Sequence, residues 1–162
     1  MRGVKQVRTL LRYAVASTAS PAEARVAALL SLPACWGGYG LPSPEANARI
    51  EVRRGGEAVA VRYADLLWRA YKLVLEYDSD AFHVGAEKIG LDSDRRAELQ
   101  KEGYTVVTLT NLQLKQRDKL DDVVRVLCRA MGRSFAPEKV DGFDERTSLL
   151  RTQIRQVRVL GW

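Results

Sequence analysis

The sequence predicts an α+β (α/β) protein with a four-stranded mixed sheet and helices on both faces of that sheet. Three observations lead to this fold class. Three strand-like runs follow one another in the middle of the chain, with short turns between them. A helical segment then leads to a fourth strand, and such a crossover normally makes the two strands it joins parallel. Helix signals before and after this region give the order α-βββ-α-β-α.

The N-terminal part contains two predicted helices. Residues 3–16 repeat apolar side chains at helical spacing. A second helix is expected over residues 21–32, where Ser20 is a suitable N-cap and Glu23 would complete a capping box. Residues 33–46 are rich in glycine and proline, and we expect them to form a loop.

Three runs of β-favouring residues follow. Gly55-Gly56 between the first two runs favours a hairpin turn, and Arg69-Ala70 marks a second tight reversal. The expected strands are Ala48–Arg53, Ala58–Leu67 and Tyr71–Asp78.

The remaining elements follow from capping and periodicity. A helix is expected from Asp92 or Ser93 to Glu102, where Asp92 would serve as the cap. Residues 146–160 alternate basic and apolar side chains, a pattern that fits either a helix or a strand. Between them we expect the strand Tyr104–Thr110 and the helix Asp118–Met131.

Length and composition fit one compact domain of 162 residues. No apolar run approaches the roughly 20 residues that span a bilayer, so no membrane association is expected. Two distant cysteines and a single histidine cannot close a zinc site, so no structural zinc is expected. Both cysteines are expected to be reduced in a cytoplasmic protein.

The charge distribution favours a polyanionic partner. The formal net charge is +6 and the pI is about 9.5. Acids concentrate between Asp65 and Asp94, whereas the basic residues recur near the two ends. Basic flanks around an acidic centre suit a protein that holds phosphates at its edges and metal in its middle. The basic positions are Arg2, Lys5, Arg8, Arg12, Arg146, Arg151, Arg155 and Arg158.

Three acids are expected to converge at one end of the sheet. Glu76 and Asp78 share a face of their strand, because side chains two apart in a strand point the same way. With a turn at Arg69-Ala70, Asp65 on the neighbouring strand would oppose a residue near position 74, with Glu76 within diagonal reach. Such carboxylates repel one another unless a cation neutralises them, and oxygen ligands suit Mg²⁺ or Mn²⁺.

These acids belong to an ordered set of motifs that covers about residues 20–131. The set consists of Ser20–Glu23, Asp65–Trp68, Glu76–Asp78–Ser79, His83, Asp92–Arg96 with Leu99, and Gly103–Tyr104 with Val106. It resembles the PD-(D/E)xK nuclease superfamily, and within it the branch of very-short-patch repair (Vsr) endonucleases and small bacterial domains.

The resemblance implies a restriction-endonuclease-like fold and a Mg²⁺- or Mn²⁺-dependent DNA endonuclease, a phosphodiester hydrolase of repair or defence. It implies Asp65 as the main metal ligand and Glu76 as the second acid, with Glu23 and Asp78 acting close to the metal. Residues 20–132 would form the nuclease-like core. Residues 1–19 would be an N-terminal helix that could end a longer upstream region, and residues 133–162 a basic C-terminal extension.

The chain departs from the family pattern at two positions. Ala64, not proline, precedes Asp65, and Asp78 stands where the superfamily usually has the lysine that helps activate water. Lys72 lies on the same strand and face as Asp78 but at the opposite end. The general base is therefore unassigned, and His83 could take the proton because a neutral imidazole does so near pH 7. The Vsr zinc site is missing, so mismatch specificity is not carried over.

Each site residue also has a purely structural explanation. Asp65 and Glu76 would be solvated strand ends, and Asp78 would shape a turn with Ser79 and Asp80. Other side chains with structural alternatives are Glu23 as a helix cap, His83 as a loop histidine, Arg96 as a partner of acids or phosphate, and Trp68 and Tyr104 as packing residues.

Two other functions compete with the nuclease. The fold could serve as a non-catalytic module that binds DNA or protein, or as a toxin–antitoxin or regulatory component. Nucleic-acid contacts are expected from Arg96, Arg8, Arg12, Arg151 and Arg155. The sequence leaves the substrate and the oligomeric state open, with a homodimer among the alternatives.

Overall fold

The computed structural model describes residues 20–54, 58–78 and 86–156, and it has an α+β fold with a four-stranded mixed sheet. The strands lie in the order β1-β2-β3-β4, antiparallel except for the parallel pair β3–β4. The meander and the crossover predicted from the sequence are confirmed. The strands are β1 (Glu45–Arg54), β2 (Ala58–Trp68), β3 (Leu73–Asp78) and β4 (Thr105–Thr110), and the helices are α2 (Pro21–Ser31), α3 (Ala86–Lys101), α4 (Asn111–Lys115), α5 (Arg117–Ala130) and α6 (Phe143–Gln156).

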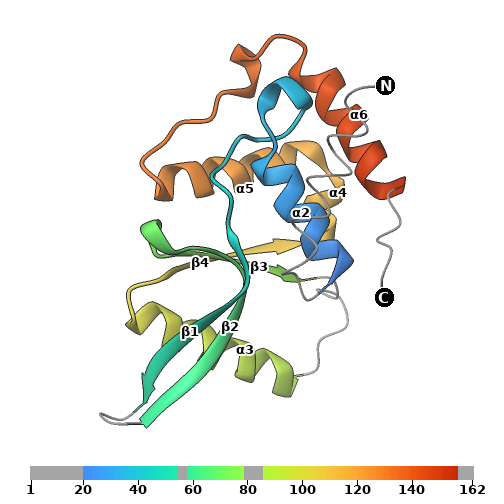
Figure 1. Cartoon of the computed structure of the whole chain (residues 1–162). Coiled ribbons are helices and arrows are strands. Elements are labelled where there is room, and N and C mark those ends of the chain that lie inside the picture. Colours follow the sequence, from blue (N-terminus) through green and yellow to red (C-terminus); the bar gives the residue numbers. More distant parts are fainter. Residues whose placement is uncertain (1–19, 55–57, 79–85, 157–162) are drawn as a thin grey trace.

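Helices cover both faces of the sheet. Figure 1 shows α2, α5 and α6 gathered on one side of it and α3 on the other. On the first side 22 of the described residues form one buried apolar core, whereas seven form the cluster on the α3 side. Most of the apolar burial that stabilises the fold therefore lies between the sheet and the α2, α5 and α6 layer.

The C-terminal segment is packed into the larger core. Residues 146–160, for which the sequence fitted either a helix or a strand, are helical as far as Gln156, where α6 ends. Phe143, Leu150 and Ile154 of α6 are buried in the same core as α2. The loop after α2 lies directly against α6, because a Cβ on Gly37 would be 2.3 Å from the carbonyl oxygen of Arg146. Gly37 also has φ +89°, a left-handed conformation that a side chain would strain.

The turn between β2 and β3 is longer than predicted. A 3-10 helix, Arg69–Tyr71, and Lys72 in the left-handed region (φ +47°) make the reversal, and β3 begins only at Leu73. The pairing of Leu66 with Leu75 then sets the register. The prediction that Asp65 opposes a residue near position 74 is therefore wrong, because Leu67 opposes Val74, and the same register continued by one pair would set Asp65 against position 76.

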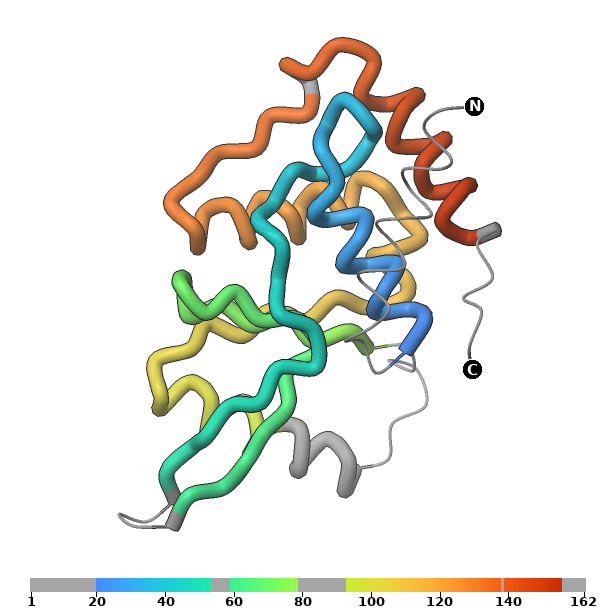
Figure 2. Tube along the Cα trace, viewed as in Figure 1, coloured from blue at the N-terminus to red at the C-terminus, as the bar shows by residue number. Residues whose placement is uncertain are grey.

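The hairpin of β1 and β2 leaves the sheet at Asp65. The two strands pair at nine positions, whereas β2 pairs with β3 at only three, and Figure 2 shows the hairpin running past β3 and β4. Ala64 packs in the α3-side cluster and Leu66 in the main core, although alternate residues of a regular strand share one face. Asn47, opposite Asp65, has φ +48°, which locates the twist at this point.

Several predicted boundaries differ from the structure. The helix expected to begin at Asp92 begins at Ala86, so Asp92 lies inside α3 and is not its cap. Helix α4 was not predicted. The predicted helix over 3–16 and the turn at 55–57 lie outside the described residues. None of the helices within the described ranges has the length and apolar character needed to cross a membrane.

Candidate active site

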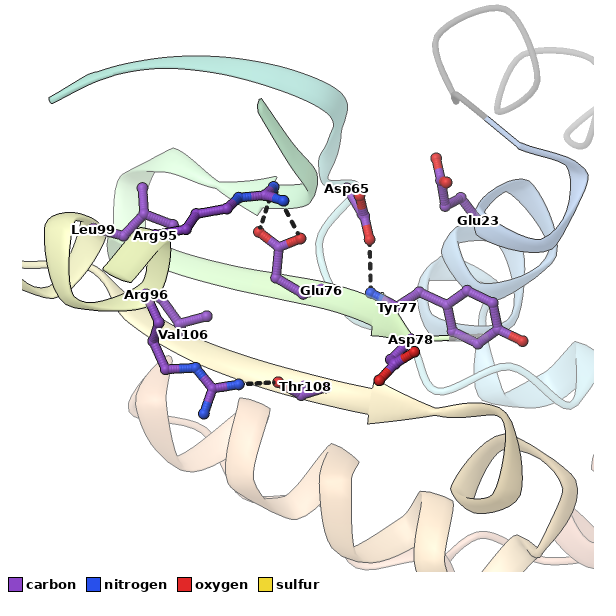
Figure 3. A pocket seen from close by; sticks show the side chains of 10 residues that line it. All are labelled: Glu23, Asp65, Glu76, Tyr77, Asp78, Arg95, Arg96, Leu99, Val106 and Thr108. Carbon is purple, nitrogen blue, oxygen red and sulfur yellow. Dashed lines mark hydrogen bonds and ion pairs between the residues drawn. The ribbon is translucent and has the colours of Figure 1, made fainter. Parts of the chain in front are cut away.

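An acidic cavity lies at the point where the hairpin leaves the sheet. Its volume is about 300 Å³. Strands β2, β3 and β4 and helices α2 and α3 all contribute side chains to it, as Figure 3 shows. The lining residues are Glu23, Asp65, Glu76, Tyr77, Asp78, Arg95, Arg96, Leu99, Val106 and Thr108. The structure thus brings together all four acids for which the family resemblance implies a role near the metal.

Asp65 holds the end of β3 with its side chain. Its Oδ2 accepts a hydrogen bond of 2.7 Å from the backbone N–H of Tyr77, just beyond the last β2–β3 pair. The carboxylate therefore replaces the β2 backbone that has turned away. Burial raises the pKa of Asp65 against the effect of this hydrogen bond, and the charge of Glu23 raises it further while Arg95 lowers it.

Glu76 is bound by an arginine that the sequence analysis did not single out. Arg95 Nη2 lies 3.2 Å from both Oε1 and Oε2 of Glu76 and also donates to the backbone carbonyl of Tyr63. The guanidinium thus joins α3 to β3 and to the open edge of β2. In Figure 3 Arg95 reaches Glu76 on one side of Asp65, while Glu23 lies on the other side.

Glu23 takes part in the N-terminal cap of α2 and also lines the cavity. Its backbone N–H donates to Ser20 Oγ at 3.2 Å, which confirms Ser20 as the N-cap of α2. The Ser20 hydroxyl in turn donates to Glu23 Oε1 at 2.8 Å. The side chain is only 9 % exposed and lines the cavity beside Asp65, so the cap holds a carboxylate at the site without excluding it.

Asp78 is the last residue of β3, whereas Lys72 precedes the strand. The prediction that Lys72 shares a strand and a face with Asp78 is wrong, because Lys72 is the left-handed residue of the turn before Leu73. Asp78 lines the cavity at the position where the superfamily usually has lysine. Lys72 Nζ donates to the carbonyl oxygen of Glu102 at 3.0 Å and lies over the ring of Tyr104. Lys72 does not line the cavity, so it cannot substitute for the lysine.

Arg96 lies beside Arg95 but binds elsewhere. Its Nη2 donates to Thr108 Oγ1 on β4 at 2.6 Å, and the side chain is exposed. The expectation that it would pair with an acid is not met by this contact. Arg96 is thus an exposed cation among the residues that line the cavity.

The other predicted residues are distributed away from the cavity. His83, Arg8 and Arg12 lie outside the described residues. Arg151 is partly buried and donates to the backbone carbonyls of Leu114 and Lys115, so it ties α6 to α4. Other contacts place Trp68 in the core with its Nε1 bonded to Pro42 O at 2.6 Å, Tyr104 under Lys72, and Arg155 exposed on α6.

The donor set agrees in kind with a hard divalent cation. Carboxylate oxygens are the groups that Mg²⁺ prefers, and the residues that line the cavity include four acids but only two arginines. Within the described ranges, however, no group of three or more His, Cys, Asp or Glu side chains is arranged to hold a metal ion. Mg²⁺ commonly keeps several waters and binds through one or two carboxylates, so Asp65 and Glu76 are the residues that could hold such an ion.

Two curated proteins of Mycobacterium tuberculosis are similar to the chain. "Uncharacterized protein Rv2248" of strain H37Rv and "Uncharacterized protein MT2308" of strain CDC 1551 are each 34% identical to it over 110 residues. The alignment covers 67% of this chain and 36% of each relative, so the chain spans about a third of their length. No protein-family model and no solved structure matches the chain.

Proposed function

We propose that the chain is a metal-dependent DNA endonuclease domain of the PD-(D/E)xK type with a restriction-endonuclease-like fold. One observation carries the proposal: Asp65 on β2 and Glu76 on β3 lie on adjacent strands and line one cavity with Glu23 and Asp78. The parallel β3–β4 pair after the crossover helix α3 agrees with this fold. The net charge of +6 favours a polyanionic substrate.

In this proposal Asp65 and Glu76 hold Mg²⁺ or Mn²⁺ at the end of β3. A cation bound there would lower the pKa of an attacking water and stabilise the charge that develops on the scissile phosphate. Asp65 is fixed by the Tyr77 N–H, so its free oxygen has a defined direction. Glu23 adds negative potential from α2, which strengthens cation binding.

The remaining groups position the substrate. Arg96 at the rim is suited to the phosphate backbone, and such contacts bind DNA without reading its sequence. Asp78 cannot supply the positive charge of the usual lysine. His83 is our candidate for the proton acceptor, and its role is tested by His83→Ala.

The direct test is cleavage of supercoiled plasmid DNA with Mg²⁺ or Mn²⁺. Asp65→Asn and Glu76→Gln should each lower the cleavage rate by about 10²-fold or more. Each variant removes a negatively charged ligand of the metal ion that would stabilise the transition state. Glu51→Gln is the matched control, because Glu51 is an exposed acid on β1 that pairs with Arg49 away from the cavity. Undiminished cleavage by the purified Asp65 and Glu76 variants would reject the site.

A non-catalytic DNA-binding module is the second candidate. The Arg95–Glu76 pair and the missing lysine favour it, since both features weaken the case for turnover. The same plasmid assay separates the two functions. A wild-type protein that shifts DNA in a gel but neither cleaves it nor binds Mn²⁺ would establish the binding module.

A further inference from the structure

Arg95 is paired with Glu76, the carboxylate that the proposed function assigns as a metal ligand. Its Nη2 contacts both oxygens of Glu76 at 3.2 Å, and the carboxylate is about one-fifth exposed (21 %). We propose that Arg95 is an internal counter-ion, which occupies Glu76 until a divalent cation binds and then contacts the phosphate of the substrate. This inference rests on the proposed function, since it assumes that Glu76 is a metal ligand.

The resting position leaves the guanidinium incompletely bonded. Every hydrogen bond that the structure gives Arg95 in the described region uses Nη2, which serves Tyr63 O and both oxygens of Glu76. Arg95 Nε is buried there and has no hydrogen-bond acceptor. A buried donor without an acceptor lowers the stability of this arrangement. Arg95 therefore gains a hydrogen bond if it turns to an acceptor that its Nε can reach.

Arg95 and a divalent cation cannot both bind Glu76 closely. A Mg²⁺ ion would lie about 2.1 Å from a carboxylate oxygen, on an acid whose two oxygens both face Arg95 Nη2. The two positive charges repel at such a separation, because partly buried charges are poorly screened. Metal binding therefore requires Arg95 to move, and the apparent affinity for metal is reduced by the population of the paired state.

The guanidinium of Arg95, once released from Glu76, is suited to bind a phosphate of the substrate. A guanidinium presents a planar fork of N–H donors that binds phosphate through two parallel hydrogen bonds. Arg95 stands on α3 next to Arg96, whose guanidinium already lies at the rim on Thr108. Once Arg95 leaves Glu76, the cavity has two adjacent arginines facing a phosphate that approaches from that rim.

The first test measures Mn²⁺ binding by calorimetry for wild type, Arg95→Gln and Arg96→Gln. Both variants remove one positive charge from the same cavity, so a general electrostatic effect would change them equally. We expect Arg95→Gln to bind Mn²⁺ about 10-fold more tightly than wild type, within the usual range of coupling between sites. Arg96→Gln should differ from wild type by less than about 3-fold, because the guanidinium of Arg96 is bonded to Thr108 on β4.

The second test measures the affinity for a 12-nucleotide thymidine single strand by fluorescence anisotropy, in Ca²⁺ and in EDTA. In wild type and in Arg96→Gln we expect Ca²⁺ to strengthen oligonucleotide binding by about 5-fold or more, since the cation frees Arg95. In Arg95→Gln the ratio of the two affinities should fall toward one. An unchanged ratio in Arg95→Gln would overturn the phosphate role.

The outcomes separate this inference from the proposed function. Equal effects of Arg95→Gln and Arg96→Gln on Mn²⁺ affinity, or no effect of either, would overturn the counter-ion alone. A wild type and variants that all fail to bind Mn²⁺ would overturn the metal site and, with it, the inference. If Arg95→Gln does not fold, Arg95→Lys keeps the charge but loses the fork, and a 2- to 5-fold gain in Mn²⁺ affinity is expected.

Discussion

The face of the sheet under α2, α5 and α6 is apolar and buried, whereas the face under α3 carries a small apolar cluster and the acidic cavity. On the first face 22 of the described residues form the core, against seven on the second. Arginine–carboxylate contacts supplement the smaller cluster: Arg62 binds Glu98 at 2.6 Å and Arg95 binds Glu76. The apolar core fixes the strands and α2, and it thereby supplies the rigidity that holds Glu23 and Asp65 close together at the cavity.

The largest effect is expected from a cavity in the apolar face. Leu120 on α5 is completely buried, so Leu120→Ala should lower the free energy of unfolding by about 2–5 kcal/mol. Leu99 on α3 is equally inaccessible but lines the acidic cavity. Leu99→Ala should cost about 2 kcal/mol, since water can enter the enlarged polar cavity. Denaturation in urea measures both values, and a larger loss for Leu99→Ala would reverse the ranking of the two faces.

A polar contact in the apolar face is expected to come next. Tyr39 OH donates to Asp121 Oδ1 at 2.6 Å, and burial together with this bond raises the pKa of Tyr39. Tyr39→Phe should lower the free energy of unfolding by about 1–3 kcal/mol, because it removes a donor from a buried carboxylate. Tyr63→Phe on the exposed side of the hairpin should change it by less than about 0.5 kcal/mol. Equal losses of unfolding free energy in the two variants would show that the Tyr39–Asp121 hydrogen bond does not stabilise the fold.

On the acidic face a substitution should stabilise the protein. Burial raises the pKa of Asp65, so in the metal-free protein stability falls as the pH rises through the interval between the ordinary and the raised pKa. Asp65→Asn keeps an oxygen for the Tyr77 N–H and removes the charge. We expect it to gain on the order of 1 kcal/mol at pH 7 in EDTA. Thermal melts of the variant from pH 3 to 8 should lack the decline in stability that is expected for wild type, and a destabilised variant would contradict the prediction.

The smallest effect is expected at an exposed ion pair. Arg49 and Glu51 on β1 are 2.6 Å apart, and both side chains are more than half exposed (55 % and 57 %). Glu51→Gln should change the free energy of unfolding by less than about 0.5 kcal/mol, because solvent screens the pair. The same variant serves as the control for cleavage. A loss above 1 kcal/mol would mean that the hairpin depends on this pair.

Local sequence signals predicted most of the elements but not their register. The three central strands follow from β-favouring runs, and the parallel fourth strand follows from the crossover. The register depends on the number of residues in the β2–β3 turn. The 3-10 helix and the left-handed Lys72 make this turn longer than the two residues expected, and no turn motif in the sequence predicts that length. Helix α4 had a readable signal: Thr110 and Gln113 form a capping box, and Thr110 Oγ1 accepts from Gln113 N at 3.2 Å.

The acidic residues of the candidate site could be predicted from the sequence, whereas the arginine that binds Glu76 could not. Asp65 and Glu76 could be identified because adjacent strands have to bring their ends together. Arg95 and Arg96 are neighbours in sequence, yet successive helix positions point about 100° apart. The orientation of α3 decides which of them meets Glu76, and that orientation follows from packing of the whole chain. The sequence analysis accordingly named Arg96 and missed Arg95.

The thinly packed α3 layer has a consequence for the motions of the protein. Segments with few buried apolar contacts open locally at a lower free-energy cost than the core. Backbone amides of β1 and of the outer part of β2 should therefore exchange with deuterium sooner than those of β3, which is buried at Leu73, Val74 and Leu75. Opening of this layer would expose the cavity from the α3 side.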